Sequence, residues 1–124
     1  MSGWRSREVR AFRSAWAGLI EALRHERHMQ FHAVAAMIVV LLGFWLDVSR
    51  EEWLWLLLAI AGVWSAELIN TAVERTVDRI STETHPLARA AKDSAAGAVL
   101  VMAIFAAAVG LIVLGPPLWR IIQS

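Results

Sequence analysis

The sequence predicts an all-α integral membrane protein, with three membrane-spanning helices preceded by an N-terminal amphipathic helix. Of its 124 residues, 58 % are hydrophobic and only 19 % are charged, and the apolar residues are gathered into three long blocks. A soluble globular domain typically has about 45–50 % apolar and about 25 % charged residues. The length predicts a single domain over residues 1–124.

The N-terminal segment, residues 1–30, is predicted to form the amphipathic surface helix. Its apolar residues recur every three or four positions with arginines between them: Val9, Phe12, Trp16, Leu19, Ile20 and Leu23. Such a helix lies on the surface of a membrane leaflet. Packing against the protein's own bundle is an alternative, and the two arrangements are compatible.

The three apolar blocks, residues 31–48, 53–80 and 94–119, are predicted to span the membrane. A spanning helix needs about 20 mostly apolar residues; the third block exceeds this length, and the first two reach it with their polar ends included. Trp45, Trp53, Trp55 and Trp119 lie near block ends, as interfacial tryptophans do. This placement favours membrane spans over a pair of buried helices in a soluble bundle.

The basic residues predict the orientation in the membrane. Ten of the 12 lie on one side of the proposed spans, namely Arg5, Arg7, Arg10, Arg13, Arg24, Arg27, Arg75, Arg79, Arg89 and Lys92. The positive-inside rule places these segments, and with them the N-terminus, in the cytoplasm and the C-terminus outside.

Small residues in the third span, Ala103, Ala106, Ala107 and Gly110, allow helices to approach closely. Three helices are few to enclose a site, so a homo-oligomer is expected.

Composition excludes several kinds of chemistry. Without cysteine there is no disulfide, Cys-ligated metal centre or thiol nucleophile. A net charge of +1 without a long basic stripe argues against nucleic-acid binding and favours the lipid bilayer as partner. Neither glycine-rich phosphate-binding pattern is present.

The most informative feature is a polar stripe at the end of the second span. Glu67, Asn70, Glu74 and Asp78 are separated by three, four and four residues, which places them within an arc of about 80° on one helix. The stripe is about 16 Å long and runs from just inside the bilayer into the cytoplasmic interface. This position suits a reaction between a lipid head group and a water-soluble reagent.

The negative charge of a carboxylate at membrane depth must be compensated by a positively charged group or ion. The candidates are a divalent cation, Arg75 or Arg79, and Lys92. Mg²⁺ commonly binds one or two carboxylates together with substrate phosphates, and Glu26 before the first span is a second source of acid.

Two groups of polar residues have simpler interpretations. The polar stripe can simply be the solvated end of its helix, and this interpretation applies most strongly to Asp78. His25, His28 and His32 share a helical spacing, which favours interfacial hydrogen bonding over a metal site.

Several motifs resemble one family. They are Ala66-Glu67-Leu68-Ile69-Asn70-Thr71-Ala72-Val73-Glu74, then Val77-Asp78, then Ala91-Lys92-Asp93 followed by Ala95-Ala96, with Glu26 before the first span. From about Phe12 to Leu114, the chain resembles the prokaryotic diacylglycerol kinases, a family of integral membrane lipid kinases that includes the undecaprenol kinases.

The resemblance implies a homotrimer in the bacterial inner membrane that uses Mg²⁺ and ATP to phosphorylate a lipid alcohol at the cytoplasmic surface. It implies that Glu67 is the general base and that Glu26 and Glu74 bind Mg²⁺. The nucleotide would be bound by Glu26, Asn70, Glu74, Asp78, Lys92 and Asp93. These roles agree with phosphoryl transfer, in which catalysis is mainly positioning and charge neutralisation.

The substrate is predicted from fewer residues. The segment 85–93 and Glu26-Arg27 look more like the undecaprenol kinase branch, so undecaprenol is favoured over diacylglycerol. Two other classes are an ion-coupled transporter that binds a cation at Glu67 and a membrane scaffold. A transporter predicts acids near mid-membrane, whereas these acids cluster at one surface.

Overall fold

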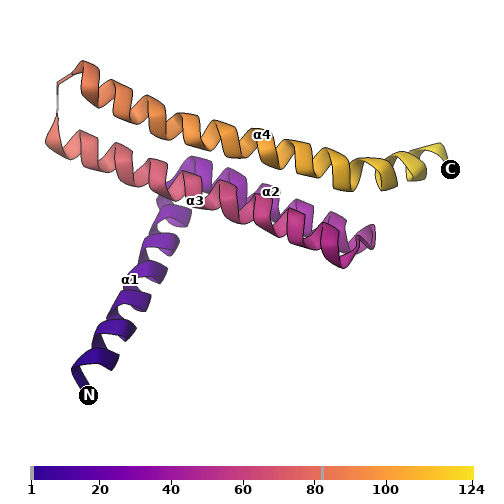
Figure 1. Ribbon diagram of the computed structural model, residues 1–124, viewed down its shortest axis with the longest axis horizontal. Coiled ribbons are helices and arrows are strands. Elements are labelled where there is room, and N and C mark those ends of the chain that lie inside the picture. Colours follow the sequence, from indigo (N-terminus) through magenta and orange to yellow (C-terminus); the bar gives the residue numbers. More distant parts are fainter. Residues whose placement is uncertain (1, 82) are drawn as a thin grey trace.

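The described part of the chain folds into four α-helices. The computed structural model describes residues 2–81 and 83–124, which contain α1 (Ser2–His25), α2 (Arg27–Trp45), α3 (Arg50–Ile80) and α4 (Pro86–Gln123) and no strand (Figure 1). The predicted all-α class is therefore confirmed.

Three of these helices are long and apolar enough to cross a membrane, namely α2, α3 and α4, with 19, 31 and 38 residues. Large apolar side chains such as Met37, Leu41, Ile104 and Leu111 are each more than 60 % exposed on the outside of the chain. An apolar exterior suits lipid, because hydrocarbon replaces the protein core as the apolar environment. The prediction of three spans agrees with this structure.

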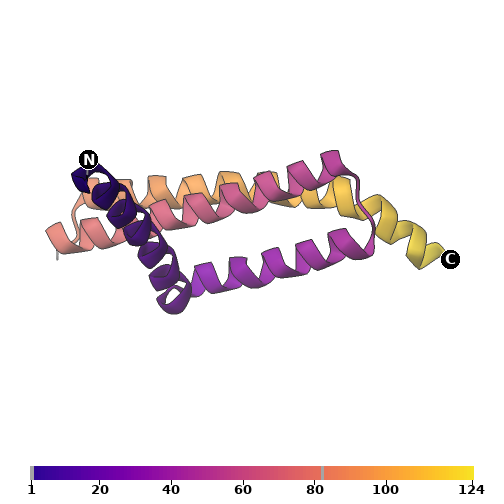
Figure 2. The same cartoon turned by 90° about the horizontal axis from the view of Figure 1, so that it is seen from below.

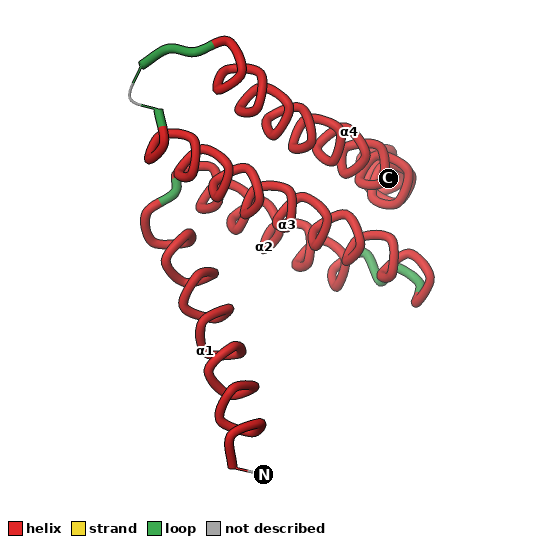
Figure 3. The backbone as a smooth tube through the Cα atoms, turned by 60° about the vertical axis from the view of Figure 1, so that its left-hand side comes forward, coloured by secondary structure: helices red, strands yellow, loops and turns green. Residues whose placement is uncertain are grey.

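The spanning helices run alternately up and down, side by side. The α2–α3 turn and the C-terminus lie toward one end, and the α3–α4 connection lies at the other (Figures 1 and 2). Helix α1 leaves the bundle at a steep angle (Figure 3). Its Ala22 is buried, but the buried apolar cluster is formed by residues beyond α1. Phe12 and Trp16 on this helix are 69 % and 52 % exposed.

The helix bounds differ from the predicted segments at several ends, and α2 ends at Trp45, three residues before the predicted span does, whereas α4 continues to Gln123. The chain breaks at Glu26, whose backbone is extended (φ −100°, ψ 117°), so residues 27–30 belong to α2 and not to the surface helix. Helices α3 and α4 begin before the predicted spans, at Arg50 and Pro86. Hydropathy marks only the apolar part of a helix, whereas backbone hydrogen bonds continue into its polar ends.

Local sequence explains where α3 and α4 begin. Ser49 and Glu52 form a reciprocal capping box: the Glu52 amide donates to Ser49 Oγ at 3.1 Å, and the Ser49 amide donates to Glu52 Oε1 at 3.0 Å. Before α4, the Leu87 amide donates to His85 Nδ1 at 3.1 Å, and Pro86 occupies the first turn. His85 therefore lies in the predicted turn and caps the following helix.

The apolar core lies between α3 and α4, toward the end of the bundle that is distant from α1. Its buried residues are Val48, Leu56, Ala59, Val109, Val113 and Leu114, with Ala106 packed against them. The small side chains of Ala59 and Ala106 let the two helices approach closely, as expected for the small residues of the third span.

We expect Gly43→Ala to destabilise the bundle. A Cβ at Gly43 would lie 2.6 Å from the indole ring of Trp53, so the rigid ring must move, at a cost of about 1–3 kcal/mol. Gly97→Ala is the matched control, because no atom lies within 4 Å of its Cβ position. Thermal unfolding in detergent measures both; equal melting temperatures for the two variants would contradict the contact with Trp53.

Candidate functional site

The polar half of α3 contacts each of the other three helices through a different charged residue. Glu67 bonds to α2, Arg75 bonds to α1 and to the α1–α2 junction, and Asp78 bonds to α4. Charged residues in the polar half of α3 therefore join this helix to α1, α2 and α4.

Glu67 is buried, with 4 % of its surface exposed. His32 Nε2 lies 3.1 Å from Glu67 Oε1, and the two residues are 35 positions apart in sequence. The sequence did not predict His32 as a partner of the acidic residues. It predicted only that His32 forms hydrogen bonds. One signal marks it: His32 is the single titratable residue between positions 31 and 46.

Arg75 holds two carboxylates at the base of α1. Its guanidinium donates to the two carboxylate oxygens of Glu21 at 2.6 and 3.2 Å and to Glu26 Oε1 at 2.7 Å. The hydrogen bonds from Arg75, assisted by its charge, hold the pKa of the Glu21 carboxyl below its usual value. The ion pair is therefore present at neutral pH and is lost only as the pH falls through that lowered pKa.

Asn70 and Glu74 form the middle of the stripe. Asn70 Nδ2 donates to Glu74 Oε1 at 3.3 Å. Asn70 Oδ1 is buried and has no hydrogen-bond partner among the described residues, whereas Glu74 is exposed. A buried oxygen without a partner is costly, so the described residues leave one acceptor of this site unused.

Three residues predicted to bind nucleotide come together at the α3–α4 connection. Asp78, Lys92 and Asp93 line one open, polar cleft of about 360 Å³, together with Arg89 and His85. Lys92 Nζ forms an ion pair with Asp78 Oδ1. The cleft is at the opposite end of the stripe from Glu67, where α3 is most exposed.

The carboxylate oxygens of the predicted ligands, Glu26 and Glu74, are of the type that Mg²⁺ binds. Within residues 2–81 and 83–124, no group of three histidine or acidic residues is placed to hold a metal ion. Mg²⁺ usually takes only one or two carboxylates and fills its remaining positions with water and substrate phosphates. Glu26 bonds to Arg75, the residue that follows Glu74 in the sequence. The assignment of Glu26 and Glu74 as metal ligands stays a prediction.

Comparisons with known proteins give a consistent result. Residues 13–114 match the family model described as "Prokaryotic diacylglycerol kinase". The undecaprenol kinase of Bacillus subtilis (strain 168) is 47 % identical over 113 residues, covering 91 % of this chain and 92 % of the relative. The diacylglycerol kinase of Escherichia coli (strain K12) is 35 % identical over 101 residues, covering 82 % and 83 %. That of a Synechocystis strain is 39 % identical over 109 residues, covering 87 % and 62 %.

The ion pair between α3 and α4 leads to a prediction about stability. We expect Asp78→Asn and Lys92→Gln each to lower the melting temperature by at most a few degrees, because exposed pairs contribute little. The charge swap of Asp78→Lys with Lys92→Asp restores the attraction and should recover most of that loss. A swapped protein less stable than both single variants would show that the pair does not join the helices. Thermal unfolding in one detergent makes the comparison.

Proposed function

Because this chain belongs to the prokaryotic diacylglycerol kinase family and is a membrane lipid kinase, we propose that it transfers the γ-phosphate of ATP to the hydroxyl of undecaprenol, giving undecaprenyl phosphate. The choice of undecaprenol as substrate rests on the 47 % identity over 113 residues to an undecaprenol kinase. Diacylglycerol is the second candidate, supported by the 35 % identity to a diacylglycerol kinase.

Glu67 is the group that accepts the proton of the lipid hydroxyl in this proposal. It is the deepest acid of the stripe and the most buried one, and carboxylates at such depth are commonly functional. As the hydroxyl oxygen attacks the γ-phosphorus, its proton passes to the Glu67 carboxylate, and ADP leaves. A positioned base of this kind contributes about 10²–10⁴-fold to a rate.

The nucleotide is bound at the exposed end of the stripe. Lys92 supplies a positive charge for phosphate oxygens, and Asn70, Asp78 and Asp93 order the site around it. Lys92 is paired with Asp78 in the free chain, so nucleotide binding exchanges one anionic partner of the ammonium group for another. Glu26 and Glu74 would hold Mg²⁺, which would neutralise phosphate charge when bound.

The proposal includes an environment and an assembly. The protein lies in the bacterial inner membrane with its N-terminus and active site in the cytoplasm and its C-terminus outside, in accordance with the ten basic residues on one side. A homotrimer completes the site, which agrees with the unused Asn70 acceptor in a single chain.

In the direct test, purified protein is incubated with labelled ATP and Mg²⁺, and undecaprenol and diacylglycerol are supplied in parallel reactions. We expect label in undecaprenol at a kcat/KM at least ten times that for diacylglycerol. Label mainly in diacylglycerol would assign the second candidate. Label in neither lipid would favour the transporter or scaffold class.

Two carboxylate variants test the assigned roles. Glu67→Gln should lower kcat by about 10²–10⁴-fold with the KM for ATP nearly unchanged, because glutamine keeps an acceptor for His32 but accepts no proton. Glu74→Gln should instead raise the Mg²⁺ concentration needed for half-maximal rate.

Glu51→Gln is the control for both, since Glu51 is an exposed acid at the opposite end of α3. An unchanged rate in Glu67→Gln would contradict the assignment of Glu67 as the base. A normal Mg²⁺ dependence in Glu74→Gln would contradict the assignment of Glu74 as a metal ligand.

A further inference from the structure

The contact between His32 and Glu67 joins the proposed base to a different helix. His32 Nε2 lies 3.1 Å from Glu67 Oε1, and the side chains are 17 % and 5 % exposed. A hydrogen bond to a carboxylate in such a water-poor place is stronger than the same bond in water. The pair is therefore well suited to fix the orientation of the carboxylate.

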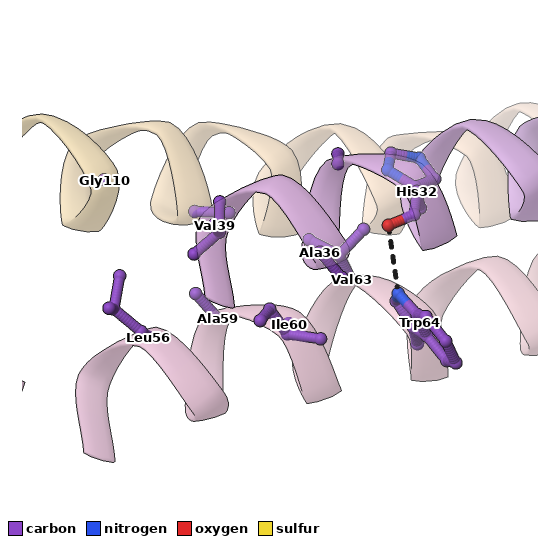
Figure 4. Close-up of a pocket in the computed structure, with 11 residues that line it drawn as sticks. His32, Ala36, Val39, Leu56, Ala59, Ile60, Val63, Trp64 and Gly110 are labelled. Atoms are coloured by element: carbon purple, nitrogen blue, oxygen red, sulfur yellow. Dashed lines mark hydrogen bonds between the residues drawn. The ribbon is translucent and has the colours of Figure 1, made fainter. Parts of the chain in front are cut away.

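His32 has contacts to both its backbone and its ring. The Trp64 indole N–H donates to the His32 carbonyl oxygen at 3.4 Å, across the α2–α3 contact (Figure 4). The Phe31 ring meets the imidazole edge-on, with ring centroids 5.3 Å apart and planes 77° apart. Neighbouring side chains and backbone thus restrict the donor that contacts Glu67.

His32 also lines an apolar cavity of about 100 Å³ between α2, α3 and α4. The other lining residues are alanine, valine, leucine, isoleucine, tryptophan and glycine, and several of them are visible around the cavity in Figure 4. Among the residues that line the cavity, His32 is therefore the only one with a titratable side chain, and no second charged group competes there for its ring nitrogens.

The chemistry of the pair follows from its atoms. Ionised Glu67 only accepts hydrogen bonds, so the nitrogen facing it carries the hydrogen, and a neutral imidazole with its proton on Nε2 satisfies this contact. Because Oε1 is engaged, the second oxygen, Oε2, remains for another donor. A lipid hydroxyl is such a donor.

We propose that His32 is a positioning residue for the base: its Nε2–H holds Glu67 Oε1 so that Oε2 points at the hydroxyl of the lipid substrate. This inference rests on the proposed kinase activity. In the transfer step the lipid oxygen bonds to the γ-phosphorus, and the bond from that phosphorus to the β,γ-bridging oxygen breaks. The hydroxyl proton moves to Oε2, and ADP leaves with the electron pair. His32 keeps its proton throughout, and Glu67 returns the acquired proton to water.

A purely structural role for His32 makes a different prediction. If the pair only joined α2 to α3, any loss of activity would parallel a loss of folded protein. A positioning role instead lowers kcat in folded protein, because a misplacement of about 1 Å at a reacting group can cost 10²-fold in rate.

The test compares His32→Gln with His32→Leu in the full-length kinase, reconstituted with ATP, Mg²⁺ and whichever lipid the wild type phosphorylates. Gln places an amide N–H near the position of Nε2, so His32→Gln should keep kcat within about threefold, whereas His32→Leu should lower kcat 10- to 100-fold. The KM for ATP should stay within twofold in both, because the nucleotide cleft is at the other end of the stripe.

Coupling to Glu67 supplies a second readout that does not depend on equal stability. In a Glu67→Gln background, His32→Leu should lower the residual rate by less than twofold, because a residue that acts through the base has no further effect once the base is absent. A full 10- to 100-fold additional loss would show that His32 acts independently of Glu67 and would overturn the proposal.

His28→Leu is the control, since His28 is an exposed histidine about one turn earlier on the same helix; its kcat should equal that of the wild type. Wild-type kcat in His32→Leu, or equal losses in folded His32→Leu and His32→Gln, would overturn the positioning role while the kinase activity stands. A wild type that phosphorylates neither lipid would instead overturn the proposed function and this inference with it.

Discussion

Charge on a membrane helix is the constraint on which this structure depends. An ionised side chain at membrane depth is costly unless it has a partner, and α3 carries acidic and basic residues along its C-terminal half. The fold satisfies them by giving Glu67 a partner on α2, Arg75 partners on and beside α1, and Asp78 a partner on α4. The contacts that provide these charged groups with hydrogen-bond or ion-pair partners are therefore the same contacts that position the helices.

This arrangement also separates two chemical environments along a single helix. Glu67 is 4 % exposed and lies beside an apolar cavity lined by its partner His32, whereas Asp78 lies in an open polar cleft. A reaction between a lipid alcohol and a water-soluble phosphate donor needs such a gradient, because one reactant is confined to hydrocarbon and the other to water. In the proposed mechanism the polar stripe brings the two reactants together across the interface.

The remainder of the molecule provides a stable frame for the stripe. The buried apolar core is small and lies between α3 and α4, toward the end opposite the polar cleft, while most large apolar side chains face outward. In water such an exterior would drive aggregation, but in a bilayer lipid covers it. Close packing through small residues such as Ala59 and Ala106 then holds the spans together.

The sequence by itself determined the four helical segments, the three spans and the common face of Glu67, Asn70, Glu74 and Asp78, because hydropathy and helical period are local properties of a chain. The break at Glu26 and the partners of the charges were decided only in the tertiary structure. His32 and Glu67 are 35 positions apart, and Glu21 and Arg75 are 54 apart. No local pattern specifies which faces of separate helices meet, since packing among all four helices sets that choice.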